Sequence, residues 1–311
     1  MIQDLLTPAV LAGIVYSGIR LATPYLYATL GETIGQLSGV LNLGVEGIML
    51  MGAYAGFYLT FRTGSPWIGL LAAIVVGALL GLANAVITVT LKAEQGISGI
   101  GVFLFGLGMS ELLFRMTLGS VETVSGFGPV RLPVLGDIPV LGDLLFNHSL
   151  MVYFAYLLVP LVWLLLNRTT WGLRIKAAGQ NPAAADALGV SINRVRYATV
   201  TLGGVLSSVA GASLSIALLN VFQQNLTSGM GFIAVALVYF GGWSPLGALA
   251  GSLLFSTVNA LQSWIQVLGI PIAPDFALML PYVLTIVMLA VPFRKARQPA
   301  ALTKPFERGE G

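Results

Sequence analysis

The chain contains no cysteine and a single histidine in 311 residues. The lack of cysteine excludes disulfide bonds and thiolate chemistry, and it carries no information about the compartment. The one histidine, His148, lies in a polar connection without a partner near it in the sequence. We therefore expect this chain to hold no metal site and to bind no cofactor of its own.

Charged residues are also scarce. Only 9% of residues are charged, against about 25% in a typical soluble domain, whereas 57% are hydrophobic. A soluble protein of this length has more surface than so few charges would cover. From Tyr197 to Pro274 there is no Asp, Glu, Lys or Arg, which leaves room for three spans of about 20 residues each. Other charge-free runs cover 67–91, 149–167 and 276–293. These runs predict a polytopic protein of the lipid bilayer.

The predicted fold is all-α, with about nine transmembrane helices in a range of eight to ten. Arg20 interrupts the first span, so residues 5–19 are alternatively an interfacial helix before a span that starts near Arg20. The seventh predicted span, 229–241, is too short to cross about 30 Å, so it is either extended by neighbouring residues or one half of a broken pair of helices. The predicted spans are 9–30, 37–61, 67–91, 96–118, 149–167, 198–219, 229–241, 246–266 and 276–293.

Glycine, in contrast, is abundant, with 38 residues. Many of these glycines recur inside the apolar runs at the small-xxx-small spacing that lets helix backbones approach closely in lipid. This pattern predicts close helix packing rather than loop punctuation. The pairs and triplets are Gly35/Gly39, Gly52/Gly56, Gly77/Gly81, Gly203/Ser207/Gly211 and Gly247/Gly251.

The basic residues between the spans predict the orientation, because cytoplasmic loops of membrane proteins are enriched in Lys and Arg. The segment 168–197 holds five basic residues against one acid, and the tail 294–311 also holds five, so both are expected in the cytoplasm. The connection 119–148 holds three acids against Arg131 and suits the outside. Nine spans then place the N-terminus outside. The net charge of +3 arises from basic residues in the loops that flank the membrane, where they determine the orientation of the protein. We therefore expect no nucleic-acid partner.

We treat residues 1–293 as one transmembrane domain with a cytoplasmic loop at 168–197, and residues 294–311 as a basic cytoplasmic tail. A weak internal repeat is visible within that domain. Ser65-Pro66 opens an apolar helix that ends at Asn84, and Ser244-Pro245 opens another that ends at Asn259. Internal duplication is common in transporters.

The loop 168–197 contains a short, well-delimited helix at 181–189. Asn181 suits the N-cap, Pro182 the first helical position and Gly189 the position after the end. So short a helix is unstable alone, and its alanine-rich face allows a partner backbone to approach closely. We interpret it as a docking element, the alternative being an ordinary loop. Its candidate contact residues are Asn181, Pro182, Ala183, Ala184, Asp186, Leu188 and Gly189.

Polar residues inside the predicted spans are candidates for a translocation pathway. Asn42 and Glu46 are four residues apart and would share one face of a helix that Gly39, Gly44 and Gly47 allow to bend or unwind. A charged residue inside a span costs about 2.5–3.5 kcal/mol, so it faces either a wet cavity or a hydrogen-bonding helix, and both readings stay open.

Two isolated amides, Asn84 and Asn259, extend this candidate pathway. The alternative for each of them is an interhelical hydrogen bond. Nothing in the chain resembles a phosphate loop, a metal-binding helix or a nucleophile elbow. We therefore expect a non-catalytic protein that does not itself hydrolyse ATP.

Two segments carry a resemblance to a known family. GETIGQLSGVLNLGVEGIMLMGAYAGF at 31–57 and AAGQNPAAADALGVSINRVRY at 177–197 resemble the permeases of bacterial ATP-binding-cassette (ABC) importers for branched-chain amino acids, ribose and nucleosides. The resemblance runs from about residue 22 to about 293. The form of the first segment that contains Glu46 is most similar to the nucleoside-type permeases.

The resemblance implies a multi-pass subunit of the bacterial inner membrane with a cytoplasmic C-terminus. Residues 182–189 would be the coupling helix that sits in a cleft of a cytoplasmic ABC ATPase, which binds ATP and Mg²⁺. This chain would form half of the pathway with a second, non-identical permease. A periplasmic or lipid-anchored solute-binding protein would deliver the solute. The alternatives are a branched-chain amino acid or simple sugar ABC permease and, from another class, an ion-coupled secondary transporter.

Overall fold

The computed structural model describes residues 7–131, 133, 135–138, 141–269, 274–290 and 298–308, and these form a bundle of helices. Four short elements lie between α5 and α7: strands β1 (Pro129–Arg131) and β2 (Asn147–Ser149), which pair antiparallel, the 3₁₀ helix Leu135–Asp137, and helix α6 (Leu141–Leu145). The other helices are α2 (Pro8–Leu37), α3 (Val45–Thr63), α4 (Pro66–Ala85), α5 (Gln95–Thr117), α7 (Leu150–Arg168), α8 (Thr170–Gln180), α9 (Pro182–Ala187), α10 (Ile192–Ser213), α11 (Met230–Phe240), α12 (Pro245–Val267) and α13 (Pro274–Ala290).

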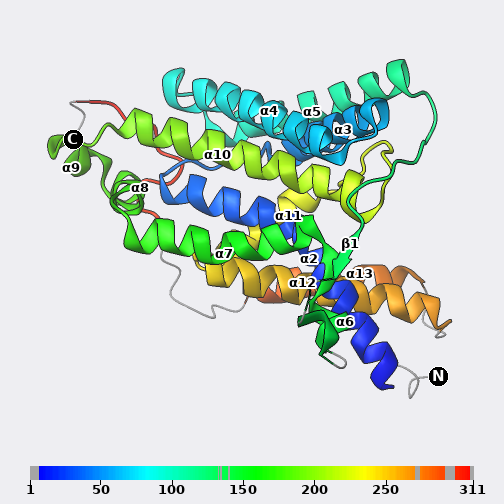
Figure 1. Ribbon diagram of the computed structural model, residues 1–311. Coiled ribbons are helices and arrows are strands. Elements are labelled where there is room, and N and C mark those ends of the chain that lie inside the picture. The colour runs from blue at the N-terminus through cyan, green and yellow to red at the C-terminus, as the bar shows by residue number, and fades with distance from the viewer. Residues whose placement is uncertain are drawn as a thin grey trace.

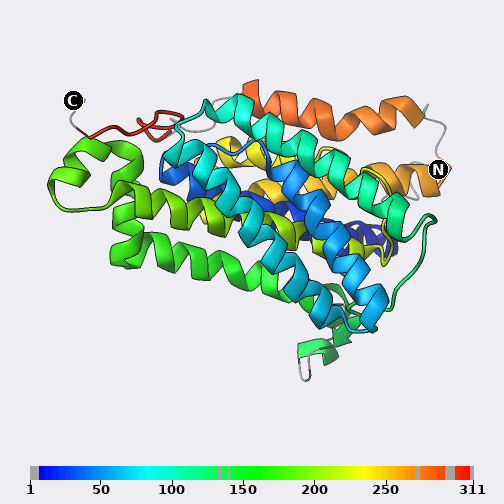
Figure 2. The ribbon, with the colours of Figure 1, turned by 90° about the horizontal axis from the view of Figure 1, so that it is seen from above.

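The long helices run side by side, and the bundle therefore has two ends (Figure 1). Helices α8 and α9 and the C-terminus lie at one end, here named the α9 end. The N-terminus, β1 and α6 lie at the other, named the β1 end. Figure 2 shows the same arrangement from above, with the two termini again at opposite ends. The loop 168–197 and the described residues of the tail, 298–308, thus share one end, as the charges of the two segments predict.

Within the part of the chain that the structure describes, five helices are long and apolar enough to cross a membrane: Pro8–Leu37, Pro66–Thr90, Gln95–Thr117, Leu150–Arg168 and Ile192–Leu218. The all-α polytopic fold is therefore confirmed, whereas the number of crossings stays a prediction. Helix α11 has only 11 residues, which span about 16 Å, so the expectation of a span too short to cross is also confirmed. An irregular segment with left-handed residues at Asn220, Asn225 and Ser228 precedes it.

Two predicted boundaries near the N-terminus are wrong. Helix α2 continues without a break through Arg20 to Leu37, so no separate helix ends at residue 19. The second span was expected from residue 37, but α3 begins at Val45. The intervening turn, residues 38–44, forms because Gly39 has a φ of +96°, which ends α2 in a conformation that favours glycine.

Glycine-mediated packing is confirmed at the centre of the bundle. A Cβ on Gly77 would lie 2.7 Å from the Gly204 carbonyl oxygen, and one on Gly81 would lie 3.1 Å from the Gly204 Cα, so α4 and α10 touch backbone to backbone. A Cβ on Gly52 of α3 would lie 2.6 Å from the Ser208 Cα. The predicted pair Gly35/Gly39 differs: a Cβ on Gly35 would meet only the Val40 carbonyl oxygen, at 3.5 Å, and Gly39 forms the turn after α2.

The two helices of the weak repeat begin alike and run in opposite directions. Ser65 and Ser244 occupy the N-cap positions of α4 and α12, and a proline follows each at the first helical position. Helix α4 runs from the β1 end to the α9 end, whereas α12 runs the other way (Figure 1). An opposed direction is what an inverted repeat requires.

Candidate functional site

Helix α9 has the caps that its sequence predicts. The Asn181 side-chain oxygen accepts a hydrogen bond from the Ala184 backbone N–H at 3.0 Å, and Pro182 takes the first helical position. Gly189 follows the helix with a φ of +84°. The helix stands at the tip of the α9 end, beside α8, which lies across that end of the bundle (Figure 1).

The outer face of α9 is apolar and uncovered. Leu188 is 86% exposed, and Ala183, Ala184 and Ala187 are exposed as well. Only Ala185 is buried, at 4% exposed, against the rest of the bundle. A small apolar surface of this kind at the end of a membrane protein is available to a partner. Its role in coupling stays a prediction.

Asp186 is the charged member of α9, and it is paired. Its two carboxylate oxygens accept hydrogen bonds from the Arg308 guanidinium at 2.8 and 2.9 Å. This hydrogen-bonded guanidinium lowers the pKa of Asp186 below its ordinary value, because it favours the carboxylate form. The side chain predicted to contact a partner is therefore already engaged by the C-terminal tail.

Glu46 lies in the first turn of α3 and is buried, at 1% exposed. Its carboxylate accepts hydrogen bonds from the Thr227 hydroxyl at 2.5 Å and from the backbone N–H groups of Gly229 and Gly231 at 2.7 and 2.6 Å. The negative charge thus caps the N-terminus of α11, where the helix dipole and the unpaired N–H groups favour an anion.

Asn42 does not share a helix face with Glu46, because it lies in the turn 38–44, before α3 begins. Its side-chain oxygen accepts from the Gly44 N–H at 2.8 Å, and its own backbone N–H donates to Glu32 at 3.0 Å. Asn42 is 5% exposed. It stabilises the turn, and the pathway role of both residues stays untested.

The two isolated amides lie in different surroundings. Asn84, near the end of α4, is fully buried, and neither its side-chain nitrogen nor its side-chain oxygen has a hydrogen-bond partner among the described residues. Asn259, in α12, is half-buried and hydrogen-bonds the Tyr25 side chain. Glu46 also lies close enough to Tyr25 to act on its side chain, so Glu46 and Asn259 share a neighbour. The pathway role of the four predicted residues stays a prediction.

A buried polar network that the sequence analysis missed holds the α9 half of the bundle together. Glu32, 2% exposed in α2, accepts from the Gln36 side chain at 2.9 Å and from the Asn42 backbone. Gln36 in turn accepts from the Trp243 indole N–H at 2.8 Å. The sequence could have indicated the hydrogen bond between Glu32 and Gln36, because the two residues lie four apart within a long apolar stretch. It could not have indicated the bond from Trp243, which lies 207 residues from Gln36.

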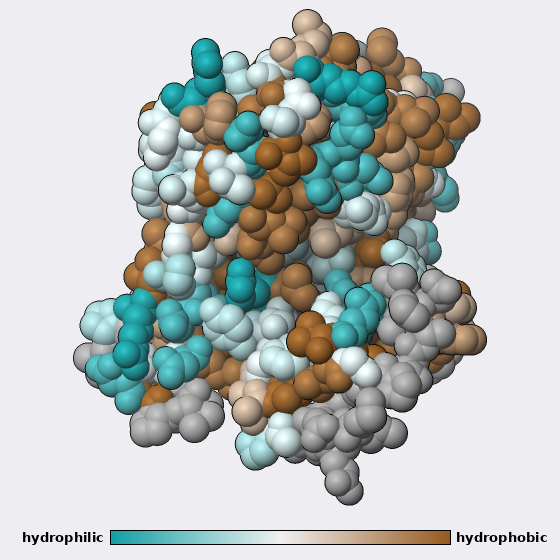
Figure 3. Space-filling view, turned by 90° about the vertical axis from the view of Figure 1, so that its right-hand side faces the viewer, coloured by the Kyte–Doolittle hydropathy of each residue, from teal (hydrophilic) through white to brown (hydrophobic). Residues whose placement is uncertain are grey.

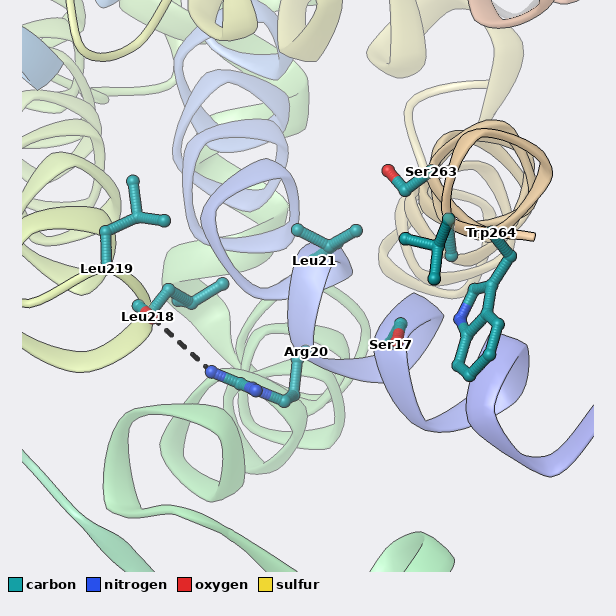
Figure 4. Close-up of a pocket in the computed structure, with 9 residues that line it drawn as sticks. Ser17, Arg20, Leu21, Leu218, Leu219, Ser263 and Trp264 are labelled. Atoms are coloured by element: carbon teal, nitrogen blue, oxygen red, sulfur yellow. Dashed lines mark hydrogen bonds between the residues drawn. The ribbon is translucent and has the colours of Figure 1, made fainter. Parts of the chain in front are cut away.

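A groove of about 420 Å³ opens between α2, α12 and the π-helical segment Leu214–Leu218 that continues α10. Its charged residue is Arg20, which donates to the Leu218 carbonyl oxygen at 3.4 Å. Figure 4 shows Arg20 turned toward Leu218, with Ser263 and Trp264 on the opposite wall. Figure 3 looks onto the β1 end and shows hydrophilic patches between hydrophobic ones around a central recess. None of the four predicted pathway residues lines the groove.

Comparison with known proteins gives the chain a family context. Residues 14–289 match the family model described as branched-chain amino acid transport system / permease component. A putative glucose ABC transporter permease of Haloferax volcanii is 39% identical over 85% of this chain and 81% of its own length. The guanosine ABC transporter permease of Bacillus subtilis is 32% identical over 97% and 98%, respectively. A nucleoside ABC transporter permease of Lactococcus lactis is 36% identical over 90% and 92%. No solved structure matches the chain.

Proposed function

Because the chain belongs to the family of branched-chain amino acid transport system permease components, we propose that it is the membrane-spanning subunit of an ATP-driven nucleoside importer. Family membership and the apolar helices make it a multi-pass transport permease. The finer assignment rests on one observation. The similarity to the guanosine permease covers 97% of this chain, including the turn 38–44 and α9.

Helix α9 is the proposed docking element for a cytoplasmic ABC ATPase, which would supply the ATP and Mg²⁺ site. The exposed Leu188 and the alanine face support this role, because they offer an apolar surface that a cleft of the partner would cover. A short helix with its own caps also moves as one rigid unit. Closure of the ATPase cleft would then displace α9 relative to α7 and α10.

The remaining partners follow from the same proposal. A second, non-identical permease would complete the pathway, and a periplasmic or lipid-anchored binding protein would deliver the nucleoside. The α9 end and the C-terminus would then face the cytoplasm of a bacterial cell. The β1 end, with its groove at Arg20, would face the binding protein.

The test is uptake by the reconstituted importer. Liposomes that contain this permease, its partner permease and the ATPase, with the binding protein outside, should accumulate labelled guanosine with ATP inside and not with ADP. Unlabelled adenosine or uridine should compete, whereas glucose and leucine should not. Competition by leucine without competition by nucleosides would move the substrate to the amino-acid class.

A simple sugar is the second candidate substrate, favoured by the 39% identity to the putative glucose permease. The same assay separates the two candidates, because glucose would then displace the label. An ion-coupled secondary transporter would leave the exposed face of α9 without a purpose. It would also show uptake that persists without ATP and collapses when the ion gradient is removed.

A further inference from the structure

The C-terminal tail is packed onto the end of the bundle instead of projecting from it. Its described residues, 298–308, are here named the strap. Ala301 and Leu302 are buried, at 6% and 4% exposed. The Ala301 N–H donates to the Gly179 carbonyl oxygen at the end of α8, at 2.9 Å. The strap therefore has a fixed anchor next to α9.

A second set of contacts joins the strap to the turn after α2. The Thr303 N–H donates to the Gly39 carbonyl oxygen at 3.2 Å. Arg196, 1% exposed in α10, donates from Nε to the Ser38 carbonyl at 3.1 Å and from Nη1 to the Lys304 carbonyl at 3.0 Å. One buried guanidinium thus bridges the turn 38–44 and the strap.

The far end of the strap reaches α9 itself. Arg308 forms the two hydrogen bonds to Asp186 that are described above, and the geometry is bidentate. Glu307 pairs with Lys92 in the connection between α4 and α5. The pKa of Asp186 is lowered and that of Arg308 is raised by their mutual hydrogen bond, so both stay charged at neutral pH.

We propose that Arg308 is a positioning residue for α9, and that the strap carries displacements of α9 to the turn 38–44 and to α10. Helix α9 has six residues, and Ala185 is its one fully buried side chain, so its own contacts hold it weakly. The strap supplies a second attachment that ends on the backbone of Gly39 and on Arg196. The family model ends at residue 289 and thus does not include the strap.

The structural half of this inference is tested on the full chain in detergent, without an ATPase. Because the chain has no cysteine, Ala301→Cys adds a single buried thiol whose labelling rate reports opening of the strap. Arg308→Ala in that background should raise the labelling rate about two- to fivefold, the shift expected on losing an exposed ion pair. Lys304→Ala is the matched control, since it removes a basic side chain and keeps the carbonyl that Arg196 binds.

Reversal of the charges separates the pair from a general disturbance. Asp186→Arg alone should also raise the labelling rate of the thiol at position 301, and Asp186→Arg combined with Arg308→Asp should return it to the original value. An unchanged rate in Arg308→Ala overturns the proposal, as does a double variant that labels as fast as the single one.

The functional half rests on the proposed ATPase partner. In the reconstituted importer, Arg308→Ala should lower guanosine uptake per ATP hydrolysed at least about twofold, and the charge-reversed pair should restore it. Normal uptake per ATP in Arg308→Ala overturns the positioning role and leaves the importer assignment intact. Absence of ATP-driven uptake with the unaltered chain would instead overturn the importer assignment, while thiol labelling at position 301 still decides whether the pair of Arg308 and Asp186 holds the strap against α9.

Discussion

At the scale of single residues, Glu46 shows how a charge is kept inside the bundle. A buried carboxylate is costly unless hydrogen bonds replace its water. Glu46 has three such bonds, all from the start of α11 or the residues just before it. These contacts support the structural alternative for Glu46, in which the side chain fixes α11, over direct contact with solute.

Glu46→Gln should therefore destabilise the protein by about 1–3 kcal/mol, because the amide nitrogen of Gln cannot accept from the N–H of Gly231 or Gly229. Thermal unfolding of the purified chain in detergent measures this. Thr227→Val, which removes one donor and keeps the charge, should cost less, about 1 kcal/mol. Unchanged unfolding together with altered transport would show that Glu46 acts in the pathway.

The sequence predicts local features of single residues well and distant ones poorly. The caps of α9 were predicted because Asn181, Pro182 and Gly189 act within a few residues of their own positions. The partners of Glu46 lie 181 to 185 residues away, and only the three-dimensional packing brings them together. The sequence allowed the chain to unwind near Gly39, but the start of α3 at Val45 was not predicted, because glycine at position 39 fits both close packing and a left-handed backbone.

At the scale of elements, glycine controls how closely the helices approach. A Cβ on Gly204 of α10 would lie 2.6 Å from the Gly77 carbonyl oxygen and 2.6 Å from the Gly81 Cα. Backbone atoms cannot move aside as a side chain can, so α4 and α10 would have to separate. Gly108 of α5 offers a contrast, since a Cβ there meets nothing within 4 Å.

Gly204→Ala should destabilise the chain by about 1–3 kcal/mol through this overpacking. Gly108→Ala makes the same chemical change in open space and should be neutral or stabilising by up to about 1 kcal/mol, because alanine favours helix. Unfolding temperatures of the two purified variants test the difference. Equal effects would mean that backbone contact between α4 and α10 does not limit the stability.

The uncovered face of α9 makes a prediction of its own. Ala184→Arg places a charged side chain on the surface proposed to dock in the ATPase, and Ala184 is exposed, so the chain itself should fold normally. We expect the ATPase to be lost during co-purification, or its stimulation by loaded binding protein to fall. Ala184→Ser is the matched small substitution and should retain both. Normal stimulation and uptake with Ala184→Arg would remove the coupling role from α9.

At the scale of the whole molecule, the distribution of charge and the fold agree. The loop 168–197, with five basic residues, meets the strap at the α9 end, where the Ala301 N–H donates to the Gly179 carbonyl oxygen. The acid-richer connection 119–148 lies at the β1 end, which holds β1 and α6 (Figure 1). The sequence could predict this pairing because topogenic charge is a property of whole loops. It could not predict that the tail would be fixed in place, since that depends on single backbone hydrogen bonds.

Which end faces the cytoplasm is the last prediction. Enrichment of Lys and Arg assigns the cytoplasm to the α9 end. Single cysteines at exposed positions test it, because the chain has none of its own: Ser125→Cys near the β1 end, and Gln180→Cys and Thr303→Cys at the α9 end. In intact cells, an impermeant thiol reagent should label position 125 and should not label 180 or 303. All three positions should react once the membrane is opened with detergent, which shows that each thiol is accessible in the folded chain. Labelling of 180 from outside intact cells would reverse the orientation, and with it the docking of a cytoplasmic ATPase at α9.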